Sequence, residues 1–353
     1  MALVSNPKTS FSMTLVSRRL VVFLFIFFVA CKPGTDLSSV HTFDGSIMGT
    51  TFMVTIAKSD LEKEDQNILQ SLIEHALIDV DEKMSTYRSD SEVSRFNTNQ
   101  TTEPFPLSEE TLTVFQHALA VSKASEGAFD VTVGPIVDAW GFGPSERHDG
   151  FPTNEKIERL KEHVGYQYIE IDSFASTVRK LNPLISVDLS GLAKGYAVDR
   201  VAELLELQGF DSYLVEVGGE IRAAGQSSRG DFWRVGIEQP VSGAPVLQRL
   251  VNLRNLSLAT SGNYRNYFEL DGKRYSHTID PRTGWPVNNR LASVSVMQTL
   301  CVKADAIATA LQVLGPEKGL ELALEHDWAV LLITRNEDGT FSERETPRFT
   351  SVS

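Results

Sequence analysis

One stretch decides the fold: Ile185-Ser-Val-Asp-Leu-Ser-Gly-Leu-Ala-Lys-Gly-Tyr-Ala-Val-Asp199. Its first five residues alternate apolar with polar side chains, which predicts a short strand, and apolar residues then recur at helical spacing until Gly209. The strand therefore passes through a turn of small residues into a helix. Such a turn leaves backbone N–H groups unpaired at the start of the helix, which suits a phosphorylated ligand. Lys194 follows the turn, where it could meet a phosphate, and Asp188 lies at the carboxyl end of the strand.

A simpler interpretation of the same stretch is a helix start rich in small residues with a solvated lysine. The stretch contains neither the GxGxxG fingerprint of dinucleotide-binding folds nor the GxxxxGK(S/T) sequence of phosphate-binding loops, so neither of those mechanisms applies. Phosphate binding at this turn is therefore a hypothesis that needs support from the rest of the chain.

Helical and strand patterns separate along the chain on either side of this stretch. Apolar residues at helical spacing cover residues 60–84 and 108–125, and again 302–314. Antiparallel-looking strands follow the stretch, and Asp271-Gly272 predicts a hairpin turn of type I′. Helices first, strands later and one strand–helix unit between them predict an α+β fold in one contiguous domain, which we place at residues 43–345.

Composition and charge limit the classes of function. The chain has 353 residues, of which 42% are hydrophobic, enough to build a core. Its formal net charge is −13, and residues 1–30 hold three basic residues and no acid, so their removal would leave −16. Because so acidic a surface repels nucleic acid and anionic lipid, we expect no nucleic-acid partner and no broad basic binding face.

The N-terminus has the pattern of a lipoprotein signal peptide. Arg18-Arg19 precede eleven apolar residues, Leu20 to Ala30, which are too few to span a bilayer but match a signal-peptide core. Phe28-Val29-Ala30-Cys31 resembles the bacterial lipobox, although Phe stands where Leu is usual. We therefore predict a signal peptide over 1–30, a lipid such as palmitate on Cys31 and a tether over 31–42. The alternative is a buried N-terminal strand or an uncleaved anchor.

Four further residues bear on export. Met13 is a second candidate for the true start of the chain. Only two cysteines exist, so a lipid on Cys31 excludes a disulfide within the chain, and Cys301 is predicted to be a small core residue rather than a nucleophile. Lys32 stands where inner-membrane retention usually has Asp. We therefore expect a domain on the periplasmic side of the envelope, with the outer membrane favoured over the inner.

Asp305 and Thr309 form the best candidate for a metal site. They stand four residues apart in the predicted helix, so they share a face, and the small Ala308 leaves space beside them. A carboxylate and a hydroxyl are hard oxygen ligands that suit Mg²⁺. The alternative is that Asp305 is a first-turn acid favoured by the helix dipole and Thr309 a core hydroxyl that bonds back to a carbonyl.

His277 and three aromatic residues are the remaining candidates. His277 ends a predicted strand just before the Asp280-Pro281 turn. There it could act as an acid, a base or a hydrogen-bond donor to phosphate, or it could be a hydrogen-bonded structural residue. Phe129, Trp140 and Phe142 could stack on a planar ring or pack in the core.

Together these segments resemble the ApbE-type flavin transferases. Eight motifs stand in the order and spacing of that family, and the resemblance covers nearly all of residues 43–335. They are Met48-Gly-Thr-Thr-Phe, Gly127-Ala-Phe-Asp-Val-Thr-Val-Gly-Pro, Trp140-Gly-Phe-Gly, Asp188-Leu-Ser-Gly-Leu-Ala-Lys-Gly-Tyr-Ala-Val-Asp, Glu216-Val-Gly-Gly-Glu, Ala259-Thr-Ser-Gly, Tyr275-Ser-His-Thr-Ile-Asp-Pro-Arg-Thr-Gly and Ala304-Asp-Ala-Ile-Ala-Thr-Ala-Leu. The resemblance implies a single T-fold-like domain of mixed, largely antiparallel strands with packed helices.

The resemblance also implies an activity, the transfer of FMN from FAD to a protein. Such an enzyme uses Mg²⁺, joins FMN through a phosphoester bond to a Thr or Ser hydroxyl of an acceptor protein, and releases AMP. Family acceptors are subunits of respiratory electron-transport complexes such as the sodium-pumping quinone reductase. Two alternatives stay open: a Mg²⁺-dependent FAD pyrophosphatase that gives FMN and AMP, and a flavin-binding lipoprotein without turnover.

Carried over by motif, the resemblance assigns the site residues. The contacts to FAD would be Met48, Tyr87, Ala128, Phe129, Asp130, Asp188, Lys194 and Ile279. The metal would be held by Asp305, Thr309 and the main-chain oxygen of Gly191, with Ala308 close by. His277 is the candidate base for the acceptor hydroxyl and would act with Asp305. Family acceptors carry an acid before Ala-Thr, which Ser257-Leu-Ala-Thr260 lacks, so we predict no self-flavinylation at Thr260.

Overall fold

The computed structural model describes residues 39–57, 60–145, 151–241, 246–263, 267–270 and 273–353, which belong to the compact unit Ser38–Ser353. The predicted signal peptide, the predicted lipidation of Cys31 and most of the predicted tether lie outside the described residues. Within the described part of the chain, no helix combines the length and the apolar character needed to cross a bilayer.

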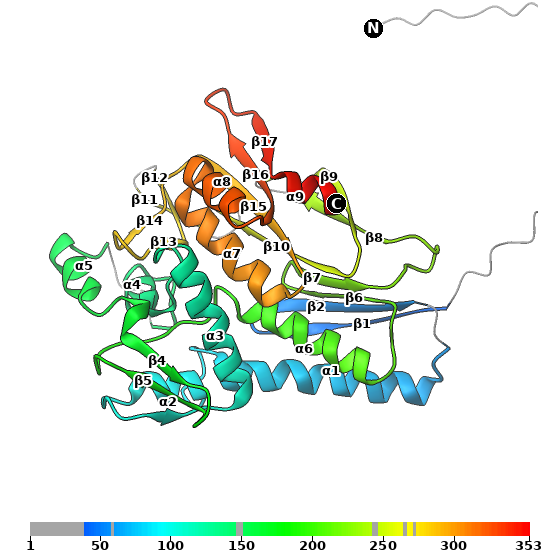
Figure 1. Cartoon of the computed structure of the whole chain (residues 1–353), viewed down its shortest axis with the longest axis horizontal. Coiled ribbons are helices and arrows are strands. Elements are labelled where there is room, and N and C mark those ends of the chain that lie inside the picture. The colour runs from blue at the N-terminus through cyan, green and yellow to red at the C-terminus, as the bar shows by residue number, and fades with distance from the viewer. Residues whose placement is uncertain (1–38, 58–59, 146–150, 242–245, 264–266, 271–272) are drawn as a thin grey trace, which may run out of the picture. The chain divides into compact units, whose positions relative to one another are not determined.

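One antiparallel sheet forms the centre of the unit. In the described part of the chain it has eight strands in the order β1-β2-β6-β7-β10-β15-β16-β17 (Figure 1). They are β1 Val40–Ile47, β2 Thr50–Ala57, β6 Tyr213–Val217, β7 Glu220–Ala224, β10 Leu256–Gly262, β15 Leu291–Gln298, β16 Ala329–Arg335 and β17 Phe341–Glu345. The predicted α+β class is confirmed. β1 already begins at Val40, inside the range predicted as tether.

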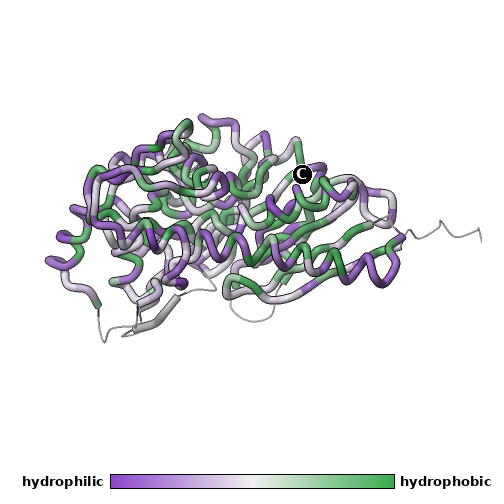
Figure 2. Tube along the Cα trace, turned by 90° about the horizontal axis from the view of Figure 1, so that it is seen from below, coloured by the Kyte–Doolittle hydropathy of each residue, from purple (hydrophilic) through white to green (hydrophobic). Residues whose placement is uncertain are grey.

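Four helices cover one face of this sheet. α6 (Ala193–Leu207) packs on β6 and β7, and α7 (Cys301–Leu314) packs on β10 and β15. α1 (Lys63–Met84) lies against α6, and α3 (Glu109–Ala124) lies against α7. Hydrophobic and hydrophilic residues alternate along the helices (Figure 2), as in amphipathic helices buried on one side, and the buried residues form the main core.

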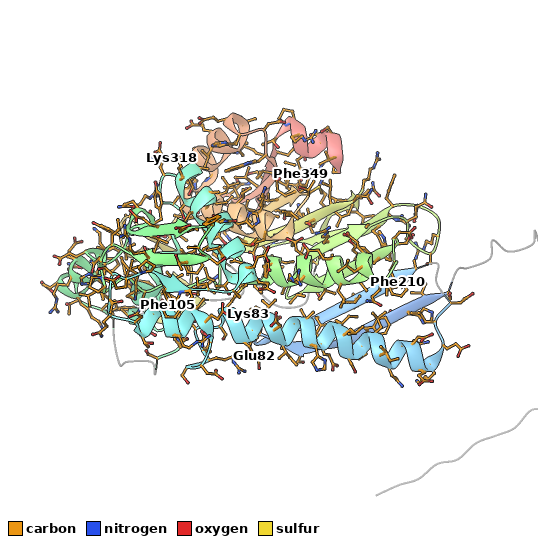
Figure 3. All side chains as sticks on the ribbon, turned by 60° about the horizontal axis from the view of Figure 1, so that its bottom comes forward. Glu82, Lys83, Phe105, Phe210, Lys318 and Phe349 are labelled. Atoms are coloured by element: carbon orange, nitrogen blue, oxygen red, sulfur yellow. The ribbon has the colours of Figure 1, made fainter. Side chains whose placement is uncertain are left out.

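The other face of the sheet is covered by a hairpin and a short helix. β8 (Trp233–Glu238) and β9 (Leu247–Leu253) pack there with α9 (Pro347–Val352), whose Phe349 is fully buried (Figure 3). Successive residues of β16 therefore enter two different cores, because side chains alternate across a strand. After β16 the chain continues through β17 and α9.

Smaller elements gather at one end of the sheet (Figure 1). They are α2 Glu92–Thr98, β3 Phe105–Pro106, η1 Val131–Val133, α4 Gly134–Ala139, α5 Asn154–Lys161, η2 Tyr166–Tyr168, β4 Ile169–Asp172, β5 Thr177–Lys180, β11 Tyr267–Leu270, β12 Lys273–Ser276, β13 Ile279–Asp280 and β14 Trp285–Pro286. α8 (Pro316–Glu325) instead packs on α7 and β16. Leu270 pairs with Lys273, which agrees with the predicted two-residue hairpin turn, although Asp271 and Gly272 themselves lie outside the described residues.

The prediction of a strand at 185–189 is wrong, because this segment belongs to no strand. Its alternating burial is as expected, but side chains replace the partners that a sheet would supply. Lys180 Nζ donates to the carbonyl oxygen of Ile185 at 3.1 Å. The side-chain amide of Asn97 both donates to the carbonyl oxygen of Val187, at 2.8 Å, and accepts from its N–H, at 2.7 Å. The segment is therefore held in place without a strand ladder.

Candidate active site

The start of α6 lies directly against the start of α7. Gly195 N donates to Asp305 Oδ2 at 3.0 Å. A Cβ atom at Gly195 would lie 2.5 Å from the carbonyl oxygen of Cys301, closer than a real Cβ atom comes, so only glycine fits between these two helices. The small-residue turn that the sequence analysis identifies therefore serves close packing of α6 against α7 as well as ligand access.

Lys194 is the cation at the centre of the site. Its Nζ forms an ion pair with Glu220 Oε2 at 2.6 Å, and the Glu220 side chain is almost fully buried. Burial opposes the charge of Lys194, but the nearby carboxylates of Glu220 and Asp305 outweigh it, so the pKa of Lys194 is raised. Glu220 lies in the Glu216-Val-Gly-Gly-Glu motif, but no role is predicted for it from the sequence. The motif alone does not indicate that Lys194 is its partner.

The cluster is short of positive charge. Burial raises the pKa of both Glu220 and Asp305, and the Lys194 ammonium lowers it only in part. Asp305 also accepts the Gly195 N–H, which favours its charged form. Two buried carboxylates thus share one ammonium. A divalent cation would supply the positive charge that this cluster lacks.

The predicted metal ligands come together beside this cluster. Thr309 Oγ1 donates to the carbonyl oxygen of Gly191 across a long 3.5 Å, and Asp305 precedes Thr309 by one turn of α7, with Ala308 fully buried next to it. Among the described residues no group of three or more His, Cys, Asp or Glu side chains could hold a metal ion. One carboxylate with a hydroxyl and a carbonyl is nevertheless a set that fits Mg²⁺, which binds few protein carboxylates and takes substrate phosphate oxygens as well.

The turn between β1 and β2 reaches the same place. Met48 adopts a left-handed backbone conformation with φ of 51°, and Thr50 follows it at the start of β2. A Cβ atom at Gly218 would lie 2.9 Å from Thr50 Cγ2 and 3.1 Å from Lys194 Cδ, so the turn, the β6–β7 connection and Lys194 are neighbours. The structure therefore brings the turn that contains Met48 near the lysine from a segment almost 150 residues away in the sequence.

Tyr87 and Asp188 lie near one another on a second side of the site. The Tyr87 side chain is 70% exposed, and its hydroxyl donates to the carbonyl oxygen of Phe142 at 3.2 Å. Partial desolvation and the nearby carboxylates of Asp188 and Asp138 raise the pKa of Tyr87. Asp188 Oδ1 accepts the N–H of Ser190 at 2.8 Å, which fixes the turn before α6. An exposed phenol at the rim is well placed to contact a ligand.

The three residues Ala128, Phe129 and Asp130 have different surroundings. Ala128 and Phe129 are buried, and the Phe129 ring packs against Gly191. Asp130 Oδ1 accepts from the N–H and the hydroxyl of Thr132, at 2.8 and 2.6 Å, and Oδ2 accepts the N–H of Tyr166 at 2.7 Å. Both oxygens of the Asp130 carboxylate thus have protein partners, so this residue shapes the loop.

His277 and Ile279 lie in the aromatic part of the site. The His277 ring stands edge-on to Phe142, with ring centroids 6.3 Å apart. Ile279 is buried in a small core with Trp140, whose Nε1 donates to the carbonyl oxygen of Gly284 at 2.9 Å. The aromatic residues of the sequence analysis are therefore mostly packing residues, and Phe142 connects His277 to Tyr87 through its ring and its carbonyl oxygen.

Comparisons with known proteins agree with this geometry. A sequence model of the ApbE family matches residues 48–332. The chain is 44% identical to the FAD:protein FMN transferase of Vibrio cholerae over 305 residues, which cover 86% of this chain and 90% of the relative. It is similar to the solved flavin transferase ApbE of Vibrio cholerae, with a TM-score of 0.82, 41% identity, and coverage of 90% of this chain and 100% of that one. The apo flavinyl transferase ApbE of Pseudomonas stutzeri gives a TM-score of 0.80 at 38% identity, covering 89% and 97%.

Proposed function

We infer that this chain is a FAD:protein FMN transferase, because it belongs to the ApbE family. The family match spans every residue of the candidate site. The observation that carries the proposal is the cluster of Lys194 with the buried carboxylates of Glu220 and Asp305 at the junction of α6 and α7, because it places a cation beside a set of hard oxygens. This is what transfer of a phosphoryl-linked group requires.

The reaction exchanges the phosphoanhydride bond of FAD for a phosphoester bond to the acceptor. The acceptor hydroxyl oxygen bonds to the phosphorus on the FMN side of the FAD pyrophosphate, the bond from that phosphorus to the bridging oxygen breaks, and AMP leaves with the electron pair. The Lys194 ammonium would stabilise negative charge on the phosphoryl oxygens. His277 is the proposed acceptor of the hydroxyl proton. When bound, Mg²⁺ would further neutralise the phosphoryl oxygens, held by Asp305, Thr309 and the carbonyl oxygen of Gly191.

The flavin nucleotide would be recognised from several sides. Met48 and Lys194 lie on one side, and Tyr87 and Asp188 on another. Among the other proposed contacts, Ala128, Phe129 and Ile279 would shape the pocket through their buried side chains, as Asp130 would through its loop. Thr260 lies in β10 with its hydroxyl 2.8 Å from that of Ser295, in keeping with the prediction that it is not an acceptor.

We further propose that the acceptor is a subunit of a respiratory electron-transport complex and that a lipid on Cys31 anchors the chain on the periplasmic side of a membrane, the outer one favoured. The support for the acceptor is the eight-motif resemblance, and the support for the anchor is the apolar run before Cys31. Mass spectrometry of the membrane-extracted protein tests the anchor, since the expected N-terminal peptide begins at an acylated Cys31.

The full chain in detergent, mixed with FAD, Mg²⁺ and a purified subunit of a sodium-pumping quinone reductase, tests the function. AMP release and the mass of the acceptor are followed together. We expect equal amounts of AMP and of acceptor carrying FMN. Asp305→Ala should lose at least about 100-fold in rate, whereas Asp65→Ala, which removes an exposed acid in the first turn of α1, should retain the wild-type rate.

The same experiment separates the alternatives. AMP and free FMN without an adduct would indicate a FAD pyrophosphatase, and FAD binding without AMP would indicate a flavin-binding lipoprotein. Neither alternative is named among the relatives above, so the transferase is the function that the structure and the comparisons support best.

A further inference from the structure

The two helices that carry the site begin without a capping side chain of their own. Leu192 precedes α6 and Leu300 precedes α7, and neither makes a side-chain hydrogen bond to the first turn. The first N–H groups of a helix have no partner within that helix, and burying them unpaired is costly. The N–H of Ala193 donates to the carbonyl oxygen of Leu189 at 2.9 Å. Gly195, Cys301 and Val302 are also buried, and the partners of their N–H groups come from elsewhere in the chain.

Each helix receives its cap from the other. Asp305 of α7 accepts the N–H of Gly195 in α6 at 3.0 Å. In return, Asp199 of α6 accepts the N–H of Cys301 through Oδ1 and that of Val302 through Oδ2, both at 2.9 Å. The two carboxylates thus form a reciprocal pair of caps across the junction of the helices.

The Asp199 carboxylate is fully occupied by protein donors. Arg222 Nη1 of β7 also donates to Oδ1, at 3.0 Å, and the Asp199 residue is only 2% exposed. Asp199 closes the motif that decides the fold, yet neither the resemblance nor the proposed reaction gives it a task. With three donors around it and almost no exposure, it cannot touch a ligand, so any effect on the reaction must pass through α7.

The cap lies close to the proposed metal ligands. Asp305 follows Cys301 by about one helical turn and Thr309 follows it by about two, each residue adding about 1.5 Å along the axis. A helix transmits a shift of its first turn to the turns that follow. The close approach of Gly195 to Cys301 leaves α7 little freedom while the cap holds.

We propose that Asp199 is a positioning residue that holds the first turn of α7. Through α7 it sets where Asp305 and Thr309 lie relative to Lys194. The inference rests on the proposed function, because only a transferase with a metal at this junction would register a small displacement of α7 as a change in Mg²⁺ dependence.

The test compares the full-length wild type with Asp199→Asn. The variant keeps the size of the side chain but presents one oxygen and an NH₂ group to three donors. We expect the Mg²⁺ concentration for half-maximal AMP release, and the Mg²⁺ dissociation constant measured by calorimetry with FAD present, to rise about 10-fold to 100-fold. The amides of Cys301 and Val302 should exchange hydrogen about 10-fold faster.

Two controls isolate the cap from general loss of stability. Leu331→Ala removes a fully buried side chain from the opposite face of the sheet and should lower the melting temperature without changing the Mg²⁺ dependence. Arg222→Met removes the ion pair but leaves both backbone hydrogen bonds to Asp199, so its Mg²⁺ dependence should stay within about threefold of the wild type. If Asp199→Asn does not fold, Asp199→Ser, which keeps one acceptor oxygen, takes its place.

The outcomes keep this inference apart from the proposed function. If the wild type is active and Asp199→Asn shows the Mg²⁺ dependence of Leu331→Ala, Asp199 is only structural and the inference is overturned. If the wild type releases no AMP, the proposed function fails, and the calorimetric Mg²⁺ titration then decides the inference alone: an unchanged dissociation constant in Asp199→Asn contradicts it.

Discussion

Two lysines of different exposure have opposite surroundings in this protein. Lys194, at the start of α6, has a side chain that is 32% exposed; it pairs with Glu220 and lies near Asp305, and these carboxylates raise its pKa despite its partial burial. Lys180, at the end of β5, is 1% exposed, and its ammonium faces the carbonyl oxygens of Asn97 and Ile185, at 3.2 and 3.1 Å, and the Phe96 ring, 4.9 Å from its centroid. Burial lowers the pKa of Lys180 to about 8.

The partners of these two lysines, together with their exposure, decide what each can do. The neighbouring carboxyl groups keep Lys194 cationic at neutral pH, which is the state that attracts a phosphate. Carbonyl dipoles and an aromatic face support the charge of Lys180 only weakly, but they use its N–H groups to hold the segment before α6. We therefore expect Lys194 to act in the reaction and Lys180 to stabilise the fold.

The largest effect should come from Lys194→Met. Removing the ammonium takes away a charge aimed at the phosphoryl oxygens, so kcat/KM for AMP release should fall about 100-fold to 1,000-fold. Lys180→Met, assayed beside it at a temperature where both variants are folded, should retain at least about a tenth of the wild-type value. Equal losses of kcat/KM in the two variants would contradict the different roles assigned to the two lysines.

Lys180→Met should affect the stability of the fold more than it affects activity. Lys180→Met leaves the carbonyl oxygens of Asn97 and Ile185 without their buried donor, so the free energy of unfolding should decrease by about 1–3 kcal/mol. Urea denaturation followed by circular dichroism measures this. A midpoint that does not move would mean that the segment before α6 needs no such donor.

A smaller effect should appear as the pH rises. The pKa of Lys180 is about 8 in the folded protein and near 10.5 when unfolded, so the unfolded chain binds more protons between these values and Lys180 adds stability as pH increases. The difference in unfolding free energy between wild type and Lys180→Met should therefore widen from pH 7 to pH 9.5. The urea series repeated at both pH values checks it, and a constant or narrowing difference would contradict the lowered pKa.

The smallest effect is expected at Lys83, which offers a third arrangement. It lies on α1 (Figure 3) and pairs with Asp79 at 2.6 Å and Glu110 at 3.3 Å, with 19% of its side chain exposed. It thus has carboxylate partners like Lys194 and a side chain no more exposed than that of Lys194, but it lies outside the site. Lys83→Met should change the free energy of unfolding by no more than about 1 kcal/mol, with AMP release within about twofold of the wild type. A loss of activity comparable to that of Lys194→Met would show that carboxylate pairing alone does not mark a catalytic lysine.

Much of the fold follows from local patterns. Helical spacing predicts α1, α3, α6 and α7, and the Asp-Gly turn predicts the β11–β12 hairpin. The one strand that fails, at 185–189, shows the limit of the method. Alternating burial is the same whether backbone groups are satisfied by a neighbouring strand or by the side chains of Lys180 and Asn97. Hydrophobic periodicity predicts which side chains are buried, but it does not predict which groups form hydrogen bonds with the backbone.

By itself, the sequence determined the α+β class, the family resemblance and the placing of Asp305 and Thr309 on one helix face, because these depend on spacing and on the order of motifs along the chain. Tertiary structure alone decided that Glu220 pairs with Lys194, that Asp130 accepts the N–H of Tyr166 and that Asp199 caps α7. Each of these rests on a buried polar group finding a partner from a distant segment. Any carboxylate of the chain could satisfy such a group equally well, so only the folded arrangement selects which one does.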